Sequence, residues 1–193
     1  MSTLLTLTLP DGAVREVAPG TLPKDVVGSI GPRLLLAAVA VSVDGEVQDL
    51  MTPLRRGGAF TVITDKDPRA LSVLRHSGAH ILATAVRRLR PEAKIGFGPA
   101  IDDGFYYDFE VDKPFTPEDL EAFEAEMKQV AAEKLPFVRA EVSQHEAVRI
   151  FADDPLKLER LADFEGTDEV ISTYTDGPFV DLCRGPHVPD TSY

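Results

Sequence analysis

A change in hydrophobic pattern at Asp67-Pro68 is the feature that most constrains how this 193-residue chain can fold. Before this dipeptide, short alternating segments end at turn residues, which is the pattern of β-strands. After it, apolar residues recur at steps of three and four as far as Pro91, which predicts one long helix from about residue 67 to residue 89. We therefore expect two domains, comprising residues 1–65 and 66–193.

The first domain reads as a small sheet-rich unit that contains one helix. The turn signal Pro10-Asp11-Gly12 lies between two alternating segments, which predicts a hairpin. The expected strands cover residues 3–9, 14–17, 37–43, 46–47 and 59–64, and the helix covers about 22–30. Strands on both sides of a helix in so short a segment suit a ubiquitin-like β-grasp, although other small α+β folds share this pattern.

The second domain combines helices with antiparallel hairpins. Thr116-Pro117 begins a helix that runs to about Glu133, and Ser143 to Glu146 form a capping box for another. Turns are expected at Asp102-Asp103-Gly104 and at Asp176-Gly177. These elements predict a two-layer α+β domain with helices against an antiparallel sheet.

The composition excludes several classes of protein. A single cysteine cannot form an intramolecular disulfide and suits a reducing compartment, so we expect a cytoplasmic protein. No apolar segment approaches the ~20 residues of a membrane span, so no membrane partner is expected. The net charge of −12 argues against a nucleic-acid partner, because phosphate recognition usually leaves a basic footprint. The charge is uneven, however, since residues 69–94 carry a local net charge of +5.

Two histidines lie one turn apart on the long predicted helix. We expect the stripe of Leu71, Leu74, Gly78, Leu82, Ala85 and Leu89 to be its buried face. His76 and His80 then lie roughly 140° and 180° from this stripe and point away from the core. Small neighbours leave room for a ligand beside the two imidazoles. Two solvent-exposed histidines are the alternative.

A second cluster of reactive residues lies near the end of the chain. Strand alternation places Asp181 and Cys183 on one side, and Gly185-Pro186 can turn His187 back toward Cys183. Together with His76 and His80 on the predicted helix, Cys183 and His187 provide three imidazoles and one thiol. They could form a zinc site with one Cys and three His ligands, or a hydrolytic pocket in which imidazoles activate water. An inert buried cysteine beside a loop histidine is the third possibility, and the residues alone do not decide.

Three motifs carry a resemblance to a known family. HSGAH at 76–80, IGFGPAIDDGFYYDF at 95–109 and VDLCRGPHVP at 180–189 resemble the editing domain of bacterial threonyl-tRNA synthetases. LTLPDGAVREV at 7–17 and VDGEV at 43–47 resemble the TGS domain that opens those enzymes. The resemblance covers essentially the whole chain. Where related chains often have HSCAH, this one has Gly78.

The resemblance implies an activity and a set of site residues. The implied reaction is hydrolysis of the ester that joins a wrongly attached serine to tRNA(Thr), in a metal-free pocket. The family's functional positions match His76, His80, Tyr107, Asp181, Cys183 and His187, and Lys157 with a less similar flank. We expect His76 and Lys157 to position or activate the attacking water. The other side chains shape the pocket and bind the seryl group. The comparable residues of alanyl-tRNA synthetase editing domains hold zinc, which stays as an alternative at His76, His80, Cys183 and His187.

The expected partners follow from the same resemblance. The acceptor end of tRNA(Thr) is the expected substrate, and a protein that holds only this end needs a basic patch rather than a basic composition. The rest of a threonyl-tRNA synthetase is a partner if the chain is a fragment. We expect the chain to lack the aminoacylation core and not to activate threonine with ATP. A non-catalytic module that binds RNA or a partner protein is the alternative function.

Overall fold

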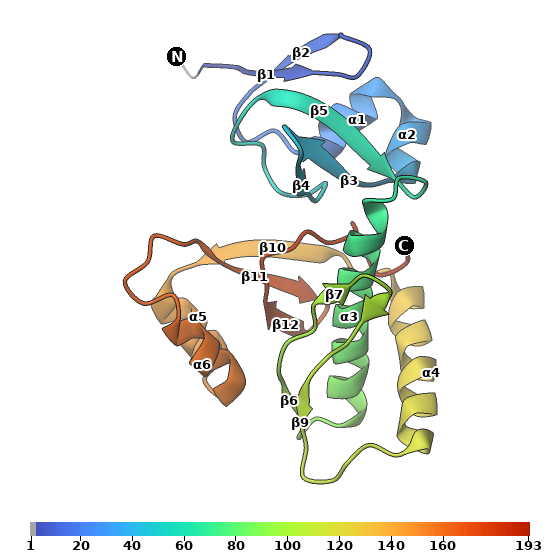
Figure 1. Cartoon of the computed structure of the whole chain (residues 1–193), viewed down its shortest axis with the longest axis vertical. Helices are drawn as coiled ribbons and strands as arrows, with labels where there is room; N and C mark the ends of the chain where they lie inside the picture. Colours follow the sequence, from blue (N-terminus) through green and yellow to red (C-terminus); the bar gives the residue numbers. More distant parts are fainter. Residues whose placement is uncertain (1–2) are drawn as a thin grey trace. The chain divides into compact units, whose positions relative to one another are not determined.

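The computed structural model describes residues 3–193, which form two compact units (Figure 1). The first unit holds the described residues up to Leu74, with Gly185–Pro189 and Tyr193, and the second holds Arg75–Arg184 and Asp190–Ser192. Mixed helices and strands confirm the predicted α+β class. No helix in residues 3–193 is both long enough and apolar enough to cross a membrane.

A five-stranded sheet with two short helices forms the first unit. The strand order is β2-β1-β5-β3-β4, in which β1 and β5 are parallel and all other neighbours are antiparallel. The core joins Val27 of α1 to Leu7, Val41 and Phe60 of the sheet, and all four are buried. The elements are β1 (Leu5–Thr8), β2 (Val14–Val17), α1 (Pro23–Ile30), α2 (Pro32–Ala37), β3 (Ala38–Val43), β4 (Glu46–Gln48) and β5 (Gly58–Thr64). The sequence pattern missed α2, which begins with a proline at its first position.

The second unit contains most of the predicted long helix, α3 (Ala70–Leu89), from Arg75 onward, beside α4 (Pro117–Glu133) and a three-stranded antiparallel sheet (Figure 1). The sheet order is β10-β11-β12, formed by β10 (Phe137–Val142), β11 (Ile171–Asp176) and β12 (Phe179–Leu182). Two short ladders pair β6 (Lys94–Ile95) with β9 (Phe109–Glu110) and β7 (Ala100–Ile101) with β8 (Gly104–Phe105). Two further helices, α5 (Gln144–Ile150) and α6 (Pro155–Ala162), pack against β11 and β12 through Phe151, Leu161, Ile171 and Leu182.

The start of α3 and its buried face both differ from the prediction. The Asp67 carboxylate accepts from the Arg69 backbone N–H, and its carbonyl accepts from Ala70, so a turn precedes the helix. Leu71 and Leu89 of the expected buried stripe are 51% and 42% exposed, whereas His80 is only 2% exposed. The expectation that both imidazoles point away from the core is therefore wrong for His80.

The reason is that α3 is covered on two sides. Small residues such as Ala79, Ala83 and Thr84 are buried on the face that bears the histidines, which approaches the sheet. Leu82 belongs to a different cluster with Phe123 of α4. A single apolar stripe describes a helix that has one buried face, and α3 has two.

The basic segment at 69–94 is not a patch of uncompensated charge. Its arginines and its lysine each contact a carboxylate or a backbone carbonyl. The contacts are Arg69–Asp67, Arg75 to the carbonyls of Ile101 and Asp102, Arg87–Asp154, Arg88 with Glu126 and Glu133, Arg90 with Glu92 and Asp119, and Lys94–Glu110. Neighbouring acids therefore balance most of the local charge of +5.

Candidate catalytic site

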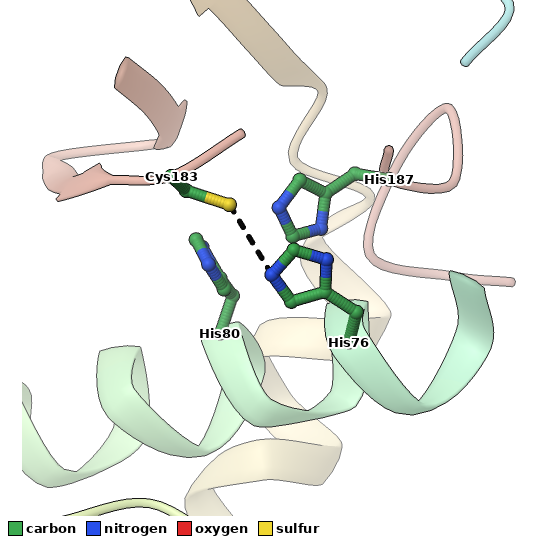
Figure 2. Close-up of side chains that lie close together, drawn as sticks. All are labelled: His76, His80, Cys183 and His187. Carbon is green, nitrogen blue, oxygen red and sulfur yellow. Dashed lines mark hydrogen bonds between the residues drawn. The ribbon is translucent and has the colours of Figure 1, made fainter. Parts of the chain in front are cut away.

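Helix α3 presents His76 and His80 to the chain that follows β12. The two ring centroids are 5.3 Å apart, as expected for side chains one turn apart on a helix. Cys183, directly after β12, places its Sγ 3.2 Å from Nε2 of His76 (Figure 2). A thiol and an imidazole thus form a close, half-buried pair.

The second half of the site is a buried ion pair. Lys157 lies in the first turn of α6, where its backbone N–H donates to the capping side chain of Asp154. The lysine side chain is 2% exposed, and its Nζ is 2.5 Å from Oδ1 of Asp181. Nζ also donates to the Gly96 carbonyl (2.5 Å) and lies 4.4 Å from the centre of the Phe97 ring. The Asp181 and Gly96 contacts occupy two of the three N–H donors of the ammonium, and the Phe97 ring lies beside it.

Asp181 connects the two halves. Its Oδ2 accepts a hydrogen bond from the hydroxyl of Tyr107 (2.6 Å) and lies 3.4 Å from Nε2 of His80. Burial favours a raised pKa for this carboxyl, but His80, the Lys157 ammonium and the hydrogen bonds from Lys157 and Tyr107 outweigh it and hold the pKa below 3.8. Asp181 is therefore an ionised carboxylate in the interior.

His80 and Tyr107, which both contact Asp181, stay neutral at pH 7. Burial lowers the pKa of His80 to about 4. The negative charge of Asp181 opposes this shift, whereas the nearby His76 and Lys157 lower the pKa further. The contact between His80 and Asp181 is therefore not a salt bridge at this pH, although the two groups are close. Burial and the Asp181 charge raise the pKa of Tyr107 well above 10, so the phenol donates a proton in a hydrogen bond and does not act as a base.

All seven residues selected from the sequence lie in or beside this arrangement. His76, His80, Cys183 and His187 form one group (Figure 2), and Tyr107, Lys157 and Asp181 form the other, which joins the first at His80. Sequence reasoning missed Gly96 and Phe97, which contact the ammonium of Lys157. It also missed the buried pair of Thr84 and Asp176, in which the threonine hydroxyl donates to the carboxylate (2.6 Å).

The glycine-rich segment before Tyr107 has a specific packing role. A β-carbon on Gly98 would lie 2.1 Å from Cδ2 of Tyr107, so no other residue fits without moving the ring. We expect Gly98→Ala to displace the phenol from Asp181, to lower the free energy of unfolding by about 1–3 kcal/mol, and to weaken the activity proposed below. Urea unfolding measures the change in the free energy of unfolding. Gly104→Ala is the matched control, because a β-carbon there meets no atom within 4 Å, and equal effects of the two changes would contradict this role.

Asp176 provides a test of the pH dependence of stability. Burial raises the pKa of this carboxyl to about 7, partly opposed by the hydrogen bond from Thr84. A raised folded-state pKa contributes stability that is complete below the unfolded value of 3.8 and is lost as the pH rises through 7. Asp176→Asn cannot ionise and keeps an acceptor for Thr84.

We therefore expect the stability of Asp176→Asn relative to the parent chain to increase by about 4 kcal/mol between pH 4 and pH 8. Titration of His80 occurs in both proteins and cancels in the difference. Urea unfolding across this pH range measures it, and a difference that does not change with pH would show that Asp176 is not held protonated.

The His and Cys side chains are a donor set that suits zinc. Their four ligand atoms lie within 4.8 Å of one another. Zinc–nitrogen and zinc–sulfur bonds of about 2.0 and 2.3 Å hold tetrahedral ligand atoms roughly 3.3–3.8 Å apart. The donor chemistry therefore fits zinc, whereas the group would have to contract to hold the ion.

Part of the first unit is similar to a known domain family. Residues 5–64, which span β1 to β5, match the family described as "TGS domain". This match agrees with the sheet order and with the resemblance of residues 7–17 and 43–47.

Nearly the whole chain is similar to bacterial threonine–tRNA ligases. It is 47% identical over 190 residues to that of Pelobacter propionicus, covering 97% of this chain. It is 46% identical over 193 residues to that of Bacillus velezensis and 47% identical over 193 residues to that of Symbiobacterium thermophilum, covering 99% of this chain in both cases. The chain spans about 30% of the length of each relative. These matches confirm the resemblance to the TGS and editing region of bacterial threonyl-tRNA synthetases.

Proposed function

We propose that this chain hydrolyses the aminoacyl ester of Ser-tRNA(Thr), as the proofreading part of a threonyl-tRNA synthetase in the cytoplasm. The observation that carries the proposal is a buried, ionised carboxylate, Asp181, held by Lys157 and Tyr107 next to the pair of His76 and Cys183. Burying such charges is costly, and ionisable groups in strongly perturbed environments are concentrated at functional sites. The similarity to threonine–tRNA ligases supports the substrate class.

His76 is the best placed general base. It is half-exposed, so water can reach it, whereas His80 is buried. In this proposal His76 removes a proton from a water molecule whose oxygen attacks the ester carbonyl carbon. The bond between this carbon and the ribose oxygen then breaks, and the ribose hydroxyl leaves with the proton. The products are free serine and uncharged tRNA(Thr).

Asp181 gives the site its selectivity for an amino acid. In this proposal its negative charge attracts the ammonium of the seryl group, and the hydroxyl oxygen of Tyr107, whose proton is donated to Asp181, accepts a hydrogen bond from the ammonium or the hydroxyl of serine. Threonine differs from serine by one methyl group, and a methylene-sized difference changes binding by only about 1–3 kcal/mol, so a second hydrolytic site is needed for accuracy. A tight pocket that rejects this methyl group then spares Thr-tRNA(Thr).

Zinc-dependent deacylation is a second candidate, favoured by the close group of His76, His80, Cys183 and His187. In that case the metal would activate the water, and His76 would be a ligand rather than a base. Elemental analysis of the purified chain and activity after chelation separate the two mechanisms. Bound zinc in equal amount, with loss of activity on chelation, would overturn the metal-free proposal.

The experiment that tests the proposal follows ester loss from Ser-tRNA(Thr) and Thr-tRNA(Thr). We expect faster release of serine than the spontaneous rate and no acceleration for threonine. Without acceleration for serine, the alternative of a non-catalytic RNA-binding module would stand. His145→Ala is the matched control for changes at His76, because His145 is exposed on α5.

A further inference from the structure

A small open cleft adjoins the candidate site on the side of Cys183. Its volume is about 160 Å³, and Phe97, Phe164, Cys183 and Arg184 are among the residues that line it. Phe97 also contacts the ammonium of Lys157, so the same ring borders both the cleft and the buried ion pair. Whatever extends from a substrate held at Cys183 can enter this cleft.

Two arginines at this cleft share one aromatic ring. The guanidinium carbons of Arg160, on α6, and Arg184 both lie 5.8 Å from the centre of the Phe164 ring. Their side chains remain 46% and 66% exposed. Stacking on the ring orders the guanidinium planes while their N–H donors stay accessible, which is the arrangement that suits phosphate oxygens and nucleic-acid bases.

The counter-ions of these arginines are exposed carboxylates. Arg160 contacts Asp163 (2.5 Å), and Arg184 contacts Glu169. Exposed pairs of this kind contribute little to stability, so a phosphate can replace a carboxylate at low cost. By contrast, Arg88 in the basic segment 69–94 is held by two carboxylates, and Arg75 is bound to two backbone carbonyls.

We propose that Arg160 and Arg184, stacked on Phe164 beside Cys183, bind the phosphates of the single-stranded 3′ end of the RNA whose ester enters the site. This inference rests on the proposed function, because it takes an aminoacyl-tRNA as the substrate. The cleft between Phe97 and Phe164 accommodates a flat ring, and the two arginines hold the backbone at its rim. The RNA contact therefore lies on α6 and the chain after β12, and not on the basic segment of α3.

Fluorescence anisotropy of a short labelled RNA that ends in CCA tests this interface on the full chain. We expect Arg184→Ala and Arg160→Ala each to weaken binding about tenfold, and each to reduce the slope of log K against log salt concentration by about 0.7. Arg149→Ala is the matched control, because Arg149 is exposed on α5 and its loss changes the net charge equally. Glu169→Gln frees Arg184 from its counter-ion and should strengthen binding about threefold, an effect that a damaged fold would not produce.

Kinetics separate this proposal from the proposed function. With Ser-tRNA(Thr), the arginine changes should raise KM and leave kcat near the parent value, whereas a seryl ester of adenosine should be hydrolysed equally by all variants. Serine release that is indifferent to Arg160 and Arg184 would overturn the interface and leave the activity standing. Arginine-dependent RNA binding without any serine release would retain the interface and overturn the activity. Equal weakening by Arg149→Ala would reduce the effect to general charge and overturn the interface.

Discussion

Asp181→Asn is expected to destabilise the second unit by about 3–5 kcal/mol, the largest stability effect that we expect from a single substitution in this chain. The change leaves the ammonium of Lys157 in the interior without its counter-charge, since that side chain is only 2% exposed. It also replaces one of the two carboxylate oxygens, which contact Lys157 and Tyr107, with an NH2 group that cannot accept a hydrogen bond. Urea unfolding followed by tyrosine fluorescence measures the effect, because three of the four tyrosines lie in Arg75–Arg184 and the chain has no tryptophan.

A double-mutant cycle shows whether the ion pair is the cause. Lys157→Met should cost about as much as Asp181→Asn, and the two changes together should cost clearly less than their sum, because no buried charge is then left unpaired. The surface pair of Glu124 and Lys128 on α4 is the matched control, and neutralising it should have no measurable effect. Additive losses at Lys157 and Asp181 would contradict a coupled buried pair.

His76→Ala is expected to lower the rate of serine release by about 10²–10⁴-fold, the range usually lost with a general base. The imidazole lies 3.2 Å from the Cys183 thiol, yet it remains reachable by water. Steady-state hydrolysis of Ser-tRNA(Thr) measures the loss, and the exposed His145→Ala variant should keep the parent rate. Equal rates for His76→Ala and the parent chain would remove His76 from the mechanism.

Cys183→Ala distinguishes two roles for the thiol. If water is the nucleophile and Cys183 shapes the pocket, this variant retains part of its activity. If the thiol itself attacks the ester, activity disappears and the parent chain accumulates a thioester in a burst phase. We expect partial retention and no burst, and a trapped seryl thioester at Cys183 would contradict water attack.

Local signals in the sequence predicted most of the fold. The helix start at Thr116 and the capping box at Ser143 are formed as expected, and the turns at Asp102-Asp103 and Asp176-Gly177 join paired strands. These features depend on a few adjacent residues, so the sequence contains the information needed to place them. The face of α3 was not predictable in this way, because it depends on α4 and on a sheet whose strands lie 50 to 100 residues further along the chain.

The sequence indicated which residues form the site, but not which of them contact one another. Motif resemblance selected Lys157, but only the structure shows it buried against Asp181 and the Gly96 carbonyl. Nothing in the flanks of Lys157 indicates that α6 turns this side chain inward. The tight approach of Gly98 to Tyr107 likewise depends on two segments that meet only in the folded chain.

Metal-free editing is tested by comparing the release of serine and threonine from Ser-tRNA(Thr) and Thr-tRNA(Thr) by the purified, chelator-treated chain. We expect serine release well above the spontaneous rate, a strong reduction in His76→Ala, and threonine release at the spontaneous rate. Loss of serine no faster than without protein would overturn the proposed hydrolysis.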